Sequence, residues 1–286
     1  MNLDTNSALQ NVLSKLDRLL DRYVDGDIKE TDLTAHPAFQ WDGRRKSLRP
    51  IARPVQIEPG DLLGIESQKQ LVLGNTARFL KGGRANNVLL WGERGTGKSS
   101  LIKSLIAAFG GTDLRMVQVL KHDILTVQDL YDIVASRPAL RFILFIDDLS
   151  FEESQTDYKE LKTIMDGGLE QIPANLLFYA TSNRKHLIPT RFSDQDSDEL
   201  RPGDTVEEKV SLADRFGLRL GFYHIDEERY LEIVDLYAKR AGIKSDRTAL
   251  QREAIRWALQ AGGRNGRIAE QFIRSAAGET GGEQNP

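Results

Sequence analysis

An eight-residue run rich in glycine limits what this chain can fold into more than any other feature. The run Gly92-Glu93-Arg94-Gly95-Thr96-Gly97-Lys98-Ser99 matches the pattern G-x-x-x-x-G-K-[S/T] in full. An apolar stretch at residues 88–91 precedes it, and residues 99–109 carry apolar side chains at helical spacing. A strand, a glycine loop and a helix in this order predict a phosphate-binding loop.

The chemistry of a polyphosphate explains why these residue types occur at this spacing. Glycines let backbone N–H groups approach phosphate oxygens without a Cβ clash, and the helix that follows directs its positive end toward the anion. We expect Lys98 to contact the β- and γ-phosphates and the Ser99 hydroxyl to ligate Mg²⁺. The residues predicted to bind the nucleotide here are Gly92, Glu93, Arg94, Gly95, Thr96, Gly97, Lys98, Ser99 and Ser100.

Short apolar runs alternate with helical stretches between residues 61 and 224. Strands are expected at residues 88–91, 114–119, 142–146, 176–180 and 218–222. Strands that alternate with helices favour a parallel sheet with crossover helices. The predicted fold class is therefore α/β, with a P-loop parallel sheet flanked by helices over residues 61–224.

The flanking segments have different patterns. Residues 225–278 show only helical spacing, which predicts a small helical domain leaning on the α/β body, and residues 279–286 are expected to be a disordered tail. Residues 1–60 are expected to form an appendage. It begins with an amphipathic helix, which packs either on its own domain or on a partner, and continues as an extended basic linker. The cations Arg44, Arg45, Lys46 and Arg49 are interpreted as solvated, with phosphate contact as the alternative.

Carboxylates follow the most apolar of the expected strands. Asp147 and Asp148 come directly after residues 142–146, which is how a P-loop protein places an acid beside Mg²⁺. We expect Asp147 to hold the metal and Asp148 to polarise the attacking water. Glu152 is the alternative base, with a plain surface carboxylate as the competing interpretation.

Polar residues also end the next expected strand, at Thr181, Ser182 and Asn183. Ligands sit at the carboxyl ends of the strands in open α/β sheets, so these side chains are expected at the same crevice. Asn183 is predicted to hold a water in line with the γ-phosphate, and the alternative is a simple polar turn.

Composition excludes several other classes of site. The 286 residues contain no cysteine, so disulfides, zinc-thiolate sites and cysteine nucleophiles are excluded. The four histidines lie at no metal-ligand spacing from one another. A net charge of −3 gives no global attraction to nucleic acid, which we do not favour as a partner. The absence of a long apolar run and of a signal pattern predicts a cytoplasmic protein without a membrane span.

The order of these motifs resembles that of AAA+ ATPases. Ile65 lies in a run similar to the segment over the adenine, Asn183 matches the residue called sensor 1, Arg215 matches the arginine finger, and Arg267 matches sensor 2 in the helical lid. The chain is most similar to a bacterial family of predicted AAA+ ATP-binding proteins catalogued as a domain of unknown function. The segments that carry this likeness are residues 87–92, 147–152, 181–184 and 214–218.

The resemblance implies ATP hydrolysis at the boundary between subunits of a homo-oligomeric ring, used for remodelling an unknown protein client or as a switch. Arg215 would reach the γ-phosphate of the neighbouring subunit, with Arg184 and Arg191 as competing fingers. The acidic segment 193–210 is expected near that boundary and to become ordered on assembly.

One departure from the AAA+ pattern supplies the alternative functions. Many AAA+ proteins have Asp-Glu where this chain has Asp147-Asp148. The Asp-Asp form also resembles helicase loaders and replication initiators, so a nucleic-acid-associated ATPase is the first alternative. A nucleotide-dependent switch with little turnover is the second.

Overall fold

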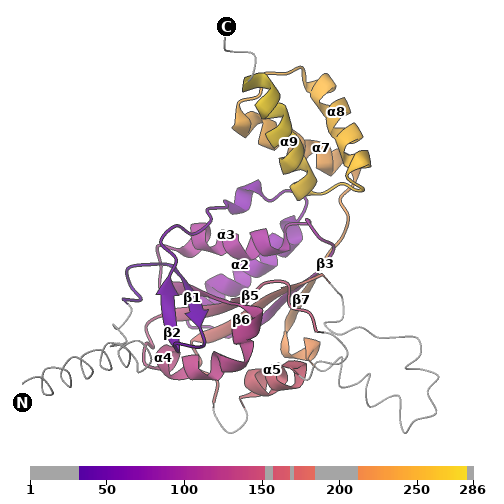
Figure 1. The fold of residues 1–286 in the computed structure, drawn as a ribbon. Helices are drawn as coiled ribbons and strands as arrows, with labels where there is room; N and C mark the ends of the chain where they lie inside the picture. The colour runs from indigo at the N-terminus through magenta and orange to yellow at the C-terminus, as the bar shows by residue number, and fades with distance from the viewer. Residues whose placement is uncertain (1–31, 152–156, 168–170, 184–211, 282–286) are drawn as a thin grey trace, which may run out of the picture.

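The computed structural model describes residues 32–151, 157–167, 171–183 and 212–281 (Figure 1). Within them a seven-stranded sheet has the order β2-β1-β4-β5-β6-β3-β7. The strands are β1 (Ala38–Asp42), β2 (Ser47–Pro50), β3 (Val88–Gly92), β4 (Leu114–Val119), β5 (Arg141–Ile146), β6 (Leu176–Ser182) and β7 (Leu218–Phe222). Neighbouring strands are parallel except in the β1–β2 hairpin. The five strands expected from the sequence are confirmed as β3 to β7.

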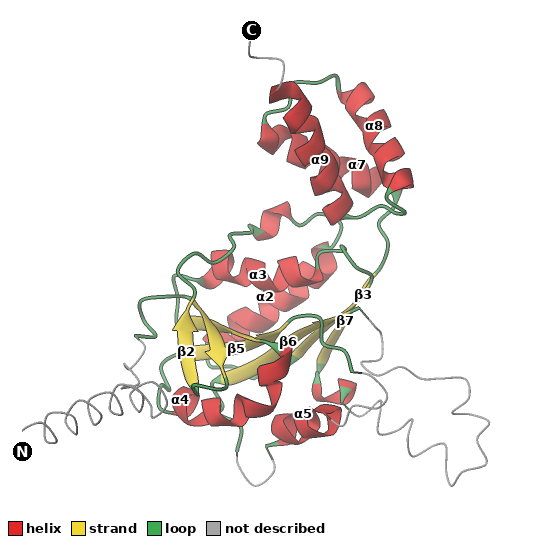
Figure 2. Ribbon diagram, viewed as in Figure 1, coloured by secondary structure: helices red, strands yellow, loops and turns green. Residues whose placement is uncertain are grey.

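Helices cover both faces of the sheet, which gives three layers (Figure 2). Helices α2 (Glu66–Leu80) and α3 (Lys98–Phe109) lie on one face, and α4 (Tyr131–Ala135) and α5 (Asp157–Asp166) on the other. A 3-10 segment, Lys121–Leu130, leads into α4. Two further 3-10 segments of the described residues, Pro59–Asp61 and Ala213–Arg215, connect elements near the site.

Strand β5 shows why the apolar run at its position folds as a central strand. Phe142, Leu144 and Ile146 pack in the core on the α4–α5 side, while Ile143 and Phe145 pack in the core on the α2–α3 side. Successive side chains of a strand point to opposite faces, so a strand covered on both faces needs apolar residues at every position. The run Phe142–Ile146 meets that requirement.

The β1–β2 hairpin corrects the expected linker. Residues 38–50 form two strands, and β1 pairs in parallel with β4. Trp41 is fully buried, and its Nε1 donates a hydrogen bond of 2.8 Å to Oγ1 of Thr126. Prolines argued for a linker, but Pro37 precedes β1 and Pro50 is the last residue of the edge strand, where a missing N–H is tolerated. The amphipathic helix expected further upstream lies outside the described residues.

The C-terminal part folds as three helices with a core of their own. They are α7 (Glu227–Ala241), α8 (Arg247–Gln260) and α9 (Gly266–Gly281), packed around Tyr230, Val234, Ala254 and Phe272. Asp226 caps α7 by accepting the N–H of Arg229 at 2.8 Å. Leu63 of the α/β part and Ile225, in the connection between β7 and α7, pack against this bundle. Within the described residues, no helix has the length and apolar character needed to cross a membrane.

Candidate functional site

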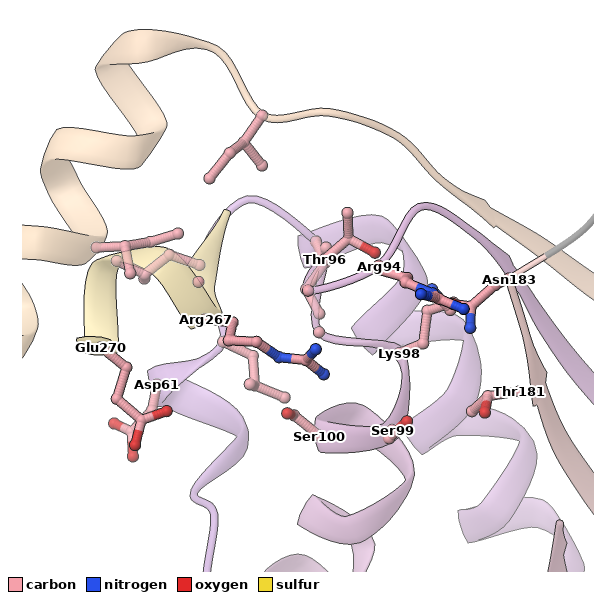
Figure 3. A pocket seen from close by; sticks show the side chains of 18 of the residues that line it. Asp61, Arg94, Thr96, Lys98, Ser99, Ser100, Thr181, Asn183, Arg267 and Glu270 are labelled. Atoms are coloured by element: carbon pink, nitrogen blue, oxygen red, sulfur yellow. The ribbon is translucent and has the colours of Figure 1, made fainter. Parts of the chain in front are cut away.

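A cleft of about 540 Å³ opens between the carboxyl ends of the central strands and the helical bundle (Figure 3). The residues predicted from the sequence that line it are Ile65, Arg94, Gly95, Thr96, Gly97, Lys98, Ser99, Ser100, Asp147, Asp148, Asn183 and Arg267. Segments far apart in the chain therefore meet at one place.

The glycine loop has a backbone that other residues would not allow. Gly92 has φ +128°, and a Cβ there would lie 2.0 Å from the carbonyl oxygen of Phe222 on β7. The loop that follows β3 can therefore pass this close to the backbone of β7 only because residue 92 has no side chain. Its neighbour Glu93 directs its carboxylate to His224, away from the residues that line the cleft.

Lys98 begins α3 and is folded back onto the loop. Its Nζ donates to the carbonyl oxygens of Gly92, at 2.8 Å, and Glu93, at 2.5 Å. The side chain is buried, and burial lowers the pKa of its ammonium group, against the opposing charges of Asp148 and Asp147. A cation buried among carbonyls is suited to bind an anion in place of these contacts.

Asp147 accepts hydrogen bonds from hydroxyl groups of two other elements. Its Oδ1 accepts hydrogen bonds of 2.6 Å from Ser99 at the start of α3 and of 2.6 Å from Thr181 at the end of β6. The ammonium of Lys103 lies 3.7 Å from Oδ2. A carboxylate beside a serine hydroxyl is the hard oxygen donor set that suits Mg²⁺. No group of three potential metal-ligating side chains occurs in the described part of the chain, so an ion here would depend on phosphate oxygens as well.

Asp148 has a strained backbone and a defined partner. Its φ of +54° is in the left-handed region, which is uncommon for a residue with a side chain and is concentrated at functional sites. Its N–H donates to Oγ1 of Thr181 at 2.9 Å, and its Oδ1 accepts a 2.5 Å hydrogen bond from Nδ2 of Asn183. The structure thus brings together the predicted water-polarising carboxylate and the predicted sensor.

Thr181 is the residue whose part in the site the sequence did not specify. Its position after an apolar strand predicted that it would face the crevice, which is confirmed. Its two hydrogen bonds to Asp147 and Asp148, the two residues that follow β5, depend on side-chain geometry that no spacing rule reveals.

The helical bundle closes the cleft on the other side. The N–H of Gly266, at the start of α9, donates to the carbonyl oxygen of Gly95 at 3.2 Å. Arg267 and Glu270 follow on α9 and line the cleft, and Arg240 of α7 forms an ion pair with Asp61. The apolar wall of the cleft consists of Leu62, Leu63, Ile65, Ile225, Ile233 and the ring of Tyr237. Such a wall fits the flat face of a base.

Arg215 does not line the cleft of its own chain. Its guanidinium forms an ion pair with Asp166 at the end of α5, in which Nη2 donates to Oδ2 at 2.9 Å. This hydrogen bond raises the pKa of Arg215 above its usual value. Its backbone is fixed by Asn87, whose Nδ2 donates to the Arg215 carbonyl at 3.1 Å. Glu152, Arg184, Arg191 and the segment 193–210 lie outside the described residues.

Comparisons with known proteins agree with this fold. The model of a family described as "Protein of unknown function (DUF815)" matches residues 34–280. No curated protein matches the sequence. A point mutant of RuvB from Thermotoga maritima superposes with a TM-score of 0.53 at 18% identity, over 77% of this chain and 65% of that one.

A second solved structure, the AAA domain of FIGL-1 in complex with ADP, gives a TM-score of 0.50 at 20% identity, over 80% of this chain and 76% of that one. The chain spans about 65% of the length of the RuvB chain that it matches. At these identities the likeness shows the fold, which is that of AAA+ ATPases.

Proposed function

We propose that this chain, which belongs to the DUF815 family and has the AAA+ fold, binds and hydrolyses ATP with Mg²⁺ at a site completed by a second copy of the chain. One observation carries the proposal. Lys98 at the start of α3, the pair Asp147 and Asp148 after β5, and Asn183 after β6 converge on one cleft beside a glycine loop.

Binding of the phosphates follows from the loop and the start of α3. The loop N–H groups and the helix N-terminus attract the anion, and Lys98 exchanges its carbonyl contacts for phosphate oxygens. Ser99 and Asp147 would hold Mg²⁺, which supplies positive charge to the phosphates when bound. The apolar wall that includes Ile65 and Tyr237 would take the adenine, and Arg267 would contact the phosphates from the bundle.

Hydrolysis requires a water to attack the γ-phosphorus while the bond to the bridging oxygen breaks. Asp148 is proposed to polarise this water and accept its proton, and Asn183 to orient it through the hydrogen bond that the two residues share. Aspartate is one methylene shorter than the glutamate of many AAA+ proteins. The strained φ of Asp148 supports its role, because it turns the residue out of the strand direction beside Asn183.

The site within one chain lacks the predicted finger. Arg215 pairs with Asp166 outside its own cleft, which is compatible with action on a neighbouring copy. We therefore propose a homo-oligomer, a ring by resemblance, that uses ATP to remodel a protein client or to switch between states.

ATP turnover against protein concentration tests the proposal. Wild type should gain specific activity with concentration, and Lys98→Ala should lose nucleotide binding. Arg215→Ala should bind ATP without concentration-dependent turnover, while Arg219→Ala, an exposed arginine four residues further on, should behave as wild type. Absence of ATP binding by wild type would refute the proposal. A salt-dependent affinity for nucleic acid would favour the helicase-loader alternative instead.

A further inference from the structure

Arg94 is an arginine of the glycine loop that makes no hydrogen bond or ion pair with any other described residue. It is exposed to solvent and lines the cleft. Two other cations line the cleft. Lys98 is held by loop carbonyls, and Arg267 of α9, like Arg94, makes no hydrogen bond or ion pair with a described residue. Arg94 therefore has a free guanidinium at the mouth of an anion-binding site.

The position of Arg94 in the loop places it at the phosphate end of the cleft. The ammonium of Lys98 contacts the carbonyls of Gly92 and Glu93, which are the two residues immediately before Arg94. Burial is the main cause of the lowered pKa of Lys98, and the positive charges of Arg267 and then Arg94 lower it further, so both guanidinium groups are within electrostatic range of its ammonium. The base end of the cleft, with Ile65 and Tyr237, is formed by other segments.

Figure 3 shows the guanidinium of Arg94 on the same side of the cleft as the ammonium of Lys98 and the amide of Asn183. Asn183 is hydrogen-bonded to Asp148, the proposed water-polarising group. The free cation thus lies beside the groups that would surround the terminal phosphate.

We propose that Arg94 binds the γ-phosphate of ATP in the same chain and stabilises the charge of the transition state. This inference rests on the proposed function and deepens it. A guanidinium offers a planar pair of N–H donors to phosphate oxygens, and the arginine that stabilises the transition state can come from the same chain or from a partner. Because Arg94 has no ion pair to give up, it is available before any second copy binds.

This assignment changes what assembly contributes. With Arg94 in place, one chain has a basal turnover that does not depend on its concentration. Arg215 of a second copy then adds to that rate rather than creating it. Removal of Arg94 lowers turnover at every protein concentration, whereas removal of Arg215 lowers only the part that rises with concentration.

Nucleotide binding tests the contact without reference to turnover. Wild type, Arg94→Ala and Arg94→Lys are titrated with fluorescent ADP and with a fluorescent non-hydrolysable ATP analogue. Arg84→Ala is the matched control, because Arg84 is an exposed arginine in the loop before β3 and does not line the cleft. Arg94→Ala should weaken binding of the ATP analogue on the order of 10-fold to 100-fold, which is the effect of losing one charged hydrogen bond. Binding of ADP should be unchanged.

Turnover at low protein concentration is then compared for the same four proteins. Arg94→Ala should lose on the order of 10³-fold in kcat, Arg94→Lys should recover part of it, and Arg84→Ala should match wild type. Thermal melting checks that all variants fold. If Arg94→Ala bound the ATP analogue with the affinity of the wild type and had the same kcat, the assignment would be overturned and the proposed function would stand. Absence of nucleotide binding by the wild type would overturn both.

Discussion

The hydroxyl of Thr181 donates a hydrogen bond of 2.6 Å to Oδ1 of Asp147. The same oxygen of Thr181 accepts the N–H of Asp148 at 2.9 Å. One side chain on β6 therefore orients the proposed metal-binding carboxylate and holds the next residue in its left-handed conformation, which costs about 1–3 kcal/mol in general. Since Thr181 is buried, water does not replace these two contacts.

We expect Thr181→Val to lose activity and stability together, because valine has the shape of threonine without the hydroxyl. The free energy of unfolding should fall by about 1–3 kcal/mol, since the hydroxyl of the buried Thr181 that bonds both Asp147 and the N–H of Asp148 is lost. Thr181→Ser keeps both hydrogen bonds and should retain most of the turnover. Urea denaturation and the Mg²⁺ dependence of ATP turnover measure these effects. Equal turnover in the valine variant and the wild type would contradict the positioning role.

The ion pair between Arg215 and Asp166 predicts a second effect. If Arg215 acts on a neighbouring copy, it must first leave Asp166. Both side chains are about one third exposed, so the pair is worth only about 0–1 kcal/mol. Asp166→Asn should therefore lower the protein concentration at half-maximal turnover, by up to about fivefold, with little change in stability.

Asp214→Asn is the matched control for that experiment, because it frees Arg219 rather than Arg215. When turnover is measured across a series of protein concentrations, the concentration at half-maximal turnover should shift for Asp166→Asn alone. If the two variants shift alike, general loss of negative charge is the cause, and the release of Arg215 is not.

The central strands could be predicted because their side chains pack into a hydrophobic core on each face of the sheet. Phe142 to Ile146 are apolar at every position, and the glycine loop and the carboxylates follow strands whose carboxyl ends share one edge of the sheet. These are local patterns combined with one topological rule. They were sufficient to predict that Lys98, Asp147 and Asn183 lie at the same cleft.

The parts that could not be predicted depend on contacts distant in sequence. β1 pairs with β4 more than 70 residues away in sequence, and its prolines and basic turn resemble those of a linker. The ion pair of Arg215 joins residues 49 positions apart. The left-handed φ of Asp148 follows from a hydrogen bond to β6, and nothing in the two-residue run Asp147-Asp148 specifies it.

The buried Trp41 tests whether the β1–β2 hairpin belongs to the folded core. Trp41→Ala should lower the free energy of unfolding by about 3–5 kcal/mol, the usual range for deletion of a buried large aromatic side chain. Trp41→Phe keeps most of the apolar surface. The free energy of unfolding should decrease less for Trp41→Phe than for Trp41→Ala. The Thr126 hydroxyl also keeps a partner, because its Oγ1 still donates to the carbonyl of Asp123 at 2.8 Å.

Urea denaturation of these variants is compared with that of Arg44→Ala, a substitution in the exposed hairpin turn that should leave the midpoint unchanged. A midpoint for Trp41→Ala equal to that of wild type would mean that the hairpin contributes nothing to the stability of the sheet.

Tyr230 of α7 predicts a loss of stability at alkaline pH. It is fully buried in the helical bundle, and its hydroxyl donates to the carbonyl oxygen of Ala254 at 3.1 Å. Burial raises the pKa of this hydroxyl from 10.0 to about 12. Between these two pH values the folded chain keeps a proton that the unfolded chain releases.

The free energy of unfolding should therefore decrease as the pH rises from about 10 to about 12, because deprotonation favours the unfolded chain. Tyr230→Phe lacks the titrating group and should be less stable than wild type by about 1 kcal/mol below pH 10. The difference between the two proteins should narrow, and then reverse, above that pH. Denaturation series at several pH values measure this difference directly, since the other tyrosines titrate in both proteins. A difference that stays constant across the range would show that Tyr230 titrates alike in the folded and unfolded chain.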